Sequence, residues 1–184
     1  KGFIVKEKAV WLPLGQYQKD ASTPPVPEYR VKITADISTP EAKIKPIGLA
    51  AKANSLVYKN GERAAIEVRV GRTAQVAIFN ITADDKVIML FPHEHEQKNT
   101  VGAGFVFPRP DGKIELIMHT LPNHKRDTEA FFVAAMDDTS NEDLGRLFTP
   151  SVPMGITAFF EKYSRIADYC EDVVVAYEVI DQEH

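Results

Sequence analysis

The chain reads AQVAIFNITADDKVIMLF over residues 74–91, and this stretch decides the fold class. Its two apolar runs, Ala74–Thr82 and Lys86–Phe91, are rich in β-branched and aromatic residues, which favour strands. Asp84-Asp85 lies between the runs, and aspartate is a common turn residue. The stretch therefore predicts two neighbouring antiparallel strands.

The same pattern continues on both sides of this stretch. Ile66, Val68 and Val70 alternate with charged residues, which is the period of a half-buried strand. Further strand-like segments follow at Gly104–Phe107, Lys113–Leu121 and Glu129–Met136. Short strands with a turn signal about every ten residues predict a mainly β protein built as an antiparallel, immunoglobulin-like β-sandwich.

The N-terminal residues form a separate region. Gly2–Leu14 and Tyr29–Ile37 have strand composition and are joined by a proline-rich segment. Two strands alone are marginally stable in water, so we expect this two-stranded ribbon to dock on the following domain or to belong to an upstream module. Thr39–Pro46 is interpreted as a linker. These features predict a ribbon with its linker over residues 1–43 and a β-sandwich domain over residues 44–184.

The C-terminal residues change to a helical pattern. Ser140-Asn141-Glu142-Asp143 resembles a capping box and predicts a short helix through Phe148. Ser151 and Pro153 predict the start of a second helix, whose apolar residues recur three and four positions apart. These apolar residues are Ile156, Phe159, Phe160, Tyr163 and Ile166. Val173–Ile180 predicts a final strand, so the sandwich is expected to carry two C-terminal helices.

Composition limits the classes of function. The 184 residues carry a formal net charge of −4, which argues against an electrostatic grip on nucleic acid or anionic lipid. Cys170 is the single cysteine, so the chain has no intrachain disulfide and no cysteine-based zinc site. No stretch is long enough to span a membrane. Because the chain opens on Lys1 without an apolar signal core, we expect it to be a piece of a longer protein.

His93-Glu94-His95-Glu96 is the most conspicuous polar cluster. On a strand, His93 and His95 would share one face at a spacing that can chelate a metal. Pro92 ends the preceding strand, however, and no third ligand follows from the sequence. The favoured interpretation is a solvated loop, and the alternative is a small-ligand or metal-binding domain that uses His93 and His95.

The other reactive residues favour structural roles. His119 and His124 lack a neighbouring nucleophile motif, and the carboxylate next to Cys170 would raise its thiol pKa. Asp84-Asp85 and Asp137-Asp138 follow strands, where aspartate forms turns. Core packing explains Phe105, Phe107, Phe131 and Phe132. No catalytic residue, cofactor or metal is therefore assigned, and a hydrolase using His119 or the aspartate pairs remains an alternative.

Several turn and core residues resemble a known family. They are Val57-Tyr58-Lys59, Gly61-Glu62, Ala77, Phe79-Asn80-Ile81, Ala83-Asp84, Lys86-Val87, Leu90-Phe91-Pro92, Asn99, Gly102, Gly104, Phe107-Pro108 and Glu129–Ala135. Over residues 47–140 the chain is similar to the bacterial domain of unknown function 4384. His93 stands where that family often has asparagine. The resemblance implies an appended, non-catalytic module, and no catalytic or binding residues are established for the family.

Residues 1–37 have a resemblance of their own. Gly2-Phe3-Ile4-Val5 and Tyr29-Arg30-Val31-Lys32-Ile33 are similar to the last strand pair of a lipoprotein-like envelope module. Together, the two resemblances imply a bacterial cell-envelope or periplasmic protein. We therefore expect a non-enzymatic accessory or protein-interaction module with a protein partner in the envelope. Its oligomeric state does not follow from the sequence.

Overall fold

A seven-stranded sheet forms the centre of the protein. The computed structural model describes residues 2–137 and 143–181. Along the sheet the strand order is β15-β10-β9-β14-β16-β6, with β11 also paired to β9, and every pairing is antiparallel except that of β16 with β6. The strands are β6 (Val57–Lys59), β9 (Ala74–Ile81), β10 (Lys86–Phe91), β11 (Thr100–Val101), β14 (Arg126–Asp137), β15 (Met154–Gly155) and β16 (Cys170–Ile180).

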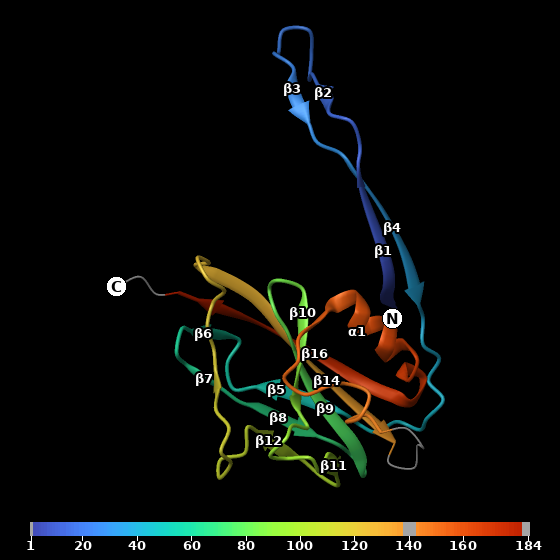
Figure 1. Cartoon of the computed structure of the whole chain (residues 1–184), viewed down its shortest axis with the longest axis vertical. Helices are drawn as coiled ribbons and strands as arrows, with labels where there is room; N and C mark the ends of the chain where they lie inside the picture. Colours follow the sequence, from blue (N-terminus) through green and yellow to red (C-terminus); the bar gives the residue numbers. More distant parts are fainter. Residues whose placement is uncertain (1, 138–142, 182–184) are drawn as a thin grey trace.

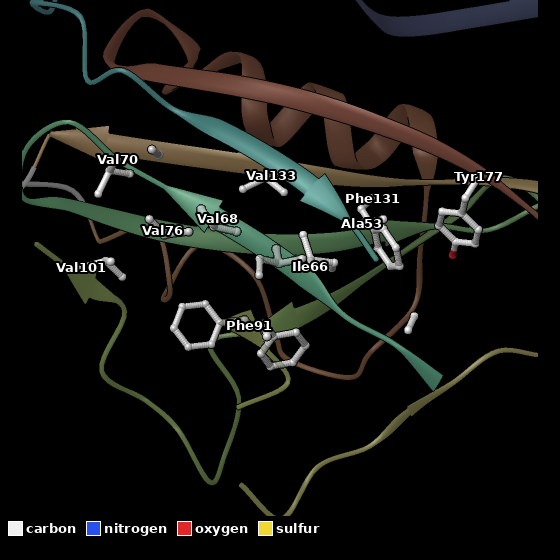
Figure 2. Close-up of a cluster of buried hydrophobic side chains, with 14 of the residues drawn as sticks. Ala53, Ile66, Val68, Val70, Val76, Phe91, Val101, Phe131, Val133 and Tyr177 are labelled. Atoms are coloured by element: carbon white, nitrogen blue, oxygen red, sulfur yellow. The ribbon is translucent and has the colours of Figure 1, made fainter. Parts of the chain in front are cut away.

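A smaller sheet packs on one face of the large one (Figure 2). Its strand order is β12-β8-β5. The strand β7, which directly precedes β8 in the chain, forms a separate short pair with β13. The bounds are β5 (Ala50–Ala53), β7 (Arg63–Ala64), β8 (Ile66–Arg69), β12 (Phe105–Phe107) and β13 (Leu116–Ile117). Ile66 and Val68 from the small sheet meet Phe131 and Val133 from the large sheet in a buried cluster.

A helical layer covers the opposite face of the large sheet. It contains α1 (Ile156–Ser164) and the 3-10 turn η1 (Ala167–Tyr169). The ring of Phe159 is fully buried and lies 4.8 Å from the ring of Phe79 and 5.5 Å from that of Phe132, measured between ring centroids. The large sheet is therefore buried on both faces, which explains why its central strands are apolar at nearly every position.

The N-terminal ribbon projects away from these layers (Figure 1). It consists of β1 (Phe3–Trp11) paired with β4 (Val31–Ser38), continued by the short pair β2 (Gly15–Tyr17) and β3 (Val26–Glu28). Among the described residues, the contact with the body lies at its base: Phe3 is buried, and its ring stacks on Phe160 at 5.0 Å and meets Tyr163 edge-on at 5.3 Å. The ribbon therefore docks on the helical layer through one end.

The segment between the ribbon and the sandwich is docked as well. The Asp168 carboxylate accepts a hydrogen bond from the Glu41 backbone N–H (2.9 Å) and pairs with the Lys43 ammonium group (2.6 Å). Further along, the Glu171 carboxylate accepts backbone hydrogen bonds from Ile47 (2.5 Å) and Leu49 (2.9 Å). Two acidic side chains near the start of β16 thus fix the path along which the chain enters the sandwich.

The expected mainly β, antiparallel architecture is confirmed, and the expectation of two C-terminal helices is wrong. Residues 140–142 of the first expected helix lie outside the described residues, and 143–148 form turns. There the Leu144 backbone N–H bonds to the Gln75 side chain (2.9 Å), while Leu144 and Phe148 are both buried in the helical layer's core. Tertiary contacts of these residues override the local helical signal.

The second expected helix exists but begins later than the sequence indicates. Ser151 has φ +60°, a left-handed conformation that cannot open a helix. Met154 and Gly155 first pair with β10, and only then does the Ile156 backbone N–H bond to the Asp85 carbonyl (2.9 Å) as α1 starts. The immunoglobulin-like arrangement of the strands remains a prediction.

The buried face of α1 generates a first prediction. Phe159→Ala should lower the free energy of unfolding by about 3–5 kcal/mol, as expected for a fully buried aromatic residue. Glu161→Ala should cost only about 0.3–0.5 kcal/mol, because its ion pair with Arg165 is exposed. Urea unfolding of both variants measures the difference. Equal, small effects would mean that α1 is not docked on the sheet.

A second prediction tests the division of the chain near residue 43. Removing residues 1–43 should leave a cooperatively folding protein, because both buried clusters are built almost entirely from residues 44–181. The melting temperature should fall, since Phe3 and the Lys43–Asp168 ion pair are lost. Differential scanning calorimetry of the shortened and full chains gives the comparison. Loss of the cooperative transition would show that the ribbon belongs to the core.

Candidate functional site

The ribbon has one apolar and one polar face. In the β1–β4 register, Trp11 lies opposite Val31, Ala9 opposite Ile33, Glu7 opposite Ala35, and Ile4 opposite Ile37. Cross-strand partners share a face, and alternate residues along a strand point the same way. A register shift between Ile4 and Lys6 brings Ile4 onto the face of Ile37. The apolar face consists of Ile4, Ala9, Trp11, Val31, Ile33, Ala35 and Ile37, with Glu7 as its one charged residue.

The opposite face, here called the polar face, carries most of the charged side chains. Lys6 lies opposite Asp36, Lys8 opposite Thr34, and Val10 opposite Lys32. Phe3 belongs to this side as the partner of Ser38, and it is Phe3 that packs on α1. The apolar face is therefore turned away from the helix that anchors the ribbon.

The apolar face is uncovered. The exposed fractions are 72% for Trp11, 65% for Ile33 and 66% for Ile37, whereas large apolar side chains in the body of the protein are mostly buried. Single exposed apolar residues are normal, but a contiguous row of them marks an interaction surface.

The far end of the ribbon is polar at its turn. The Asp20 carboxylate accepts hydrogen bonds from the hydroxyl groups of Thr23 and Ser22, both at 2.7 Å. These bonds, that of Thr23 above all, lower the pKa of Asp20 below its ordinary value. The turn is thus held by its own side chains, and exposed apolar residues continue along the ribbon as far as the Tyr17–Val26 pair beside it.

His93 differs from its expected setting. The expectation of a solvated loop is wrong for this residue, because its side chain is buried, whereas His95 is exposed. The His95 backbone N–H donates to His93 Nδ1 (3.0 Å), so the neutral ring carries its proton on Nε2. That Nε2 and the Asn99 Nδ2 are both buried, without a hydrogen-bond partner among the described residues. Burial lowers the pKa of His93, which keeps the ring neutral near pH 7.

A hollow of about 590 Å³ lies beside this loop. Residues from two segments line it, the loop after β10 and the turns before α1: Pro92, His93, Glu94, Arg146, Pro150 and Ser151 among them. The described residues contain no group of three His, Cys, Asp or Glu side chains that could hold a metal ion. His93 Nδ1 already accepts a backbone hydrogen bond, so this nitrogen is not free to join His95 in chelation.

The remaining histidines lie apart from this loop. His124 Nδ1 lies 2.6 Å from the buried Asp127 carboxylate, which also accepts the Leu121 backbone N–H (2.5 Å) and so closes the loop before β14. His119 is exposed. Neither ring is brought next to a serine or cysteine nucleophile by a hydrogen bond in the described structure.

The other sequence candidates take structural positions. The Asp84 carboxylate accepts the Thr82 hydroxyl (2.6 Å) in the β9–β10 turn, and Asp137 pairs with Arg72 (2.7 Å), while Asp138 lies outside the described residues. Burial raises the pKa of the Cys170 thiol to about 12, which makes it a poor nucleophile. The four phenylalanines pack in the cores: Phe107, Phe131 and Phe132 are buried, and Phe105 is partly buried.

A buried polar group escaped the sequence analysis. The Tyr177 hydroxyl lies 2.7 Å from Glu129 Oε2 and 2.6 Å from Asn80 Oδ1, and Asn80 Nδ2 donates to the same carboxylate oxygen (3.0 Å). Burial, together with Glu129, raises the pKa of Tyr177. The only signal in the sequence was an asparagine inside an apolar strand. Because its members satisfy one another, this group stabilises the large sheet.

Comparison with known proteins gives one match. The family model described as a domain of unknown function (DUF4384) matches residues 57–120, about a third of the chain. The match supports the family resemblance from β6 to the residues after β13, including the His93 loop, and it covers neither the ribbon nor α1. No curated protein and no solved structure matches the chain. Among the described residues, no helix has the length and apolar character needed to cross a membrane.

The buried His93 predicts a pH-dependent contribution to stability. Its folded pKa is lowered, so the unfolded chain takes up a proton at a pH where the folded chain does not. The contribution of His93 is complete above pH 6.5 and declines as the pH falls through the unfolded pKa toward the folded one. Between about pH 7.5 and about pH 5.5, an interval around the usual histidine pKa of about 6.5, the melting temperature of the parent should therefore decrease. The decrease should be smaller for His93→Asn, which keeps a hydrogen-bond acceptor.

The matched control is His95→Asn, because the His95 side chain is exposed. Its pH profile should follow that of the parent. Identical profiles for the parent and His93→Asn would contradict the prediction. Thermal unfolding followed by circular dichroism at each pH is sufficient for the comparison.

Proposed function

We propose that this chain is a non-catalytic accessory and protein-interaction module of a bacterial cell-envelope protein, and that the apolar face of the ribbon is its contact surface. The observation that carries the proposal is the uncovered row of large apolar side chains on a ribbon held only at its base. Water around such a row is released when a partner covers it, so binding is favourable.

The net charge of the chain and the chemistry of the ribbon indicate the type of partner. The chain has a net charge of −4, which disfavours contact with nucleic acid or anionic lipid. At the end of the ribbon the turn is closed by hydrogen bonds to the Asp20 carboxylate, while Tyr17 and Val26 beside it are exposed apolar residues. A protein surface lying along the apolar face fits both features.

The residues that the sequence offered for catalysis take structural positions in the described part of the chain. The His124–Asp127 pair closes a loop, Cys170 is buried with a raised pKa, and the described aspartates of the two pairs hold turns or ion pairs. A hydrolytic site needs a nucleophile, a base and a charge stabiliser within reach of one another. The described residues do not bring such a set together.

The envelope location rests on the family resemblance. The match over residues 57–120 supports the DUF4384 family, and the similarity of residues 1–37 to a lipoprotein-like envelope module supports a bacterial envelope or periplasmic setting. Two sheets packed face to face, with a shared apolar core, also support the immunoglobulin-like sandwich that we propose for residues 44–184.

A small-ligand function around His93 is the second candidate. The hollow beside the loop and the unpartnered Nε2 favour it, because a buried N–H without an acceptor is a position where a ligand oxygen would be stabilised. The ring lies deep, however, so the ligand would have to reach a buried nitrogen. The side chains of the exposed apolar face, in contrast, are directly accessible to a partner.

The proposal predicts that capture of envelope proteins depends on the apolar face. Immobilised parent protein and Ile33→Lys are compared in a bacterial envelope extract, and bound proteins are identified by mass spectrometry. Ile33→Lys places a charge in the centre of the apolar face and should lose the specific partner. Ile33 is 65% exposed, so the variant should fold normally.

Thr34→Lys is the matched control, since it adds the same charge one residue away on the polar face. It should capture the same partner as the parent. Equal capture by the parent and Ile33→Lys would place the contact surface elsewhere on the molecule, and the loops at the ends of the two sheets would then be the next surfaces to test.

A further inference from the structure

We infer that the apolar face of the ribbon binds the same face of a second copy of this chain, so that two ribbons pack face to face across a two-fold axis. This inference rests on the proposed function, because it names the partner of the surface described there. It draws on three properties of the ribbon: the direction of the face, its area and the order of its residues.

The direction of the face leaves it open to another molecule. Phe3, on the polar side of the ribbon, packs against Phe160 and Tyr163 of α1. Ile4 and Ile37 lie on the other side and are 44% and 66% exposed. The described part of this chain therefore cannot fold its own helical layer over the apolar face without giving up the Phe3 contact.

The area of the face suits a weak dimer. A large side chain has about 150–250 Å² of surface, so the exposed fractions of Ile4, Trp11, Val31, Ile33 and Ile37 leave roughly 500 Å² uncovered. Two such faces would bury roughly 1,000 Å² together, which is the lower limit for a biological interface. The expected association is therefore reversible and dependent on concentration.

The order of residues makes the face complementary to itself. A two-fold axis across the ribbon, between the pair Ala9/Ile33 and the pair Glu7/Ala35, places β1 over β1 and β4 over β4 in opposite directions. Ile33 of one copy then faces Ala35 of the other, a large residue over a small one. Val31 faces Ile37, and Trp11 faces Ile4, so the bulky residues close the two ends.

The charged residue on the face is compatible with this packing. Glu7 of one copy faces the small Ala9 of the other. Since the ribbon is only two strands wide, every side chain on it lies near an edge. The Glu7 carboxylate can therefore stay in water at the rim while its methylene groups cover Ala9.

The test is a concentration series by sedimentation equilibrium with the full chain. The parent should show a monomer–dimer equilibrium, Ile33→Lys should be monomeric, and Thr34→Lys on the polar face should associate like the parent. A parent that remains monomeric at the highest concentration overturns the inference. A dimer that persists in Ile33→Lys overturns it as well, because the copies then meet elsewhere.

A residue exchange tests the two-fold arrangement itself. Ile33→Ala leaves small residues facing each other, and Ala35→Ile makes large residues collide, so each single variant should weaken association at least tenfold. The double variant Ile33→Ala/Ala35→Ile restores one large and one small residue at each contact and should recover most of the parent's affinity. Without recovery in the double variant, the antiparallel pairing is wrong.

The two proposals fail in different ways. If the chain stays monomeric while capture from the envelope extract still depends on Ile33, the face serves a different protein, and only the two-fold inference falls. If neither self-association nor capture depends on Ile33, both fall. Circular dichroism of each variant confirms that the ribbon changes have not altered the folded body.

Discussion

The pairing of β14 with strands on both sides is the constraint on which the rest of the structure depends. Arg126–Met136 pairs with Ile180–Cys170 of β16, while Ala130–Asp137 pairs with Ile81–Ala74 of β9. Because side chains alternate along a strand, Phe131 and Val133 enter the core under the small sheet, and Phe132 and Ala134 enter the core under α1. A slip by one residue would exchange the two sets, so the register and both cores specify each other.

The core under α1 also determines how the flanking segments are placed. The rings of Phe132, Phe159 and Tyr163 pack together, and Phe3 joins them from the N-terminal ribbon. The acidic side chain of Asp168 then holds the linker where it crosses the helical layer. The ribbon thus extends from the second core at its base and projects away from the body along the rest of its length (Figure 1).

The sequence was sufficient for features set by local periodicity. Strands were correctly indicated by the alternation at Ile66, Val68 and Val70 and by the apolar run of Glu129–Met136. A strand that is buried on one or both faces needs apolar residues at the buried positions, and these are visible in the sequence. The buried face of α1 was also predicted, since Phe159 and Tyr163 are four residues apart. The ribbon strands were identified by composition, but their two faces depend on a register shift between Ile4 and Lys6 that residue types do not reveal.

Features set by tertiary contact could not be predicted in this way. Leu144 donates to Gln75, nearly seventy positions away, and this bond replaces the helix that the local pattern favoured. His93 follows a proline in a polar stretch, which indicates a solvated loop, yet its side chain is buried and its ring lies 6.4 Å from that of Phe107. A single sequence contains no signal for either effect.

The two candidate sites differ in whether the chain alone can offset the free-energy cost of their unsatisfied groups. The unpartnered N–H of His93 costs about 1–3 kcal/mol, and one ordered water molecule can offset that cost within this chain. A bound water molecule cannot stabilise the apolar face of the ribbon in the same way, because the free-energy cost of this face is its exposure to water. Since Phe3 anchors the ribbon with that face turned outward, the described chain cannot satisfy it alone. Another protein surface would cover it, and for this reason the proposed interaction is placed on the ribbon and not on the loop around His93.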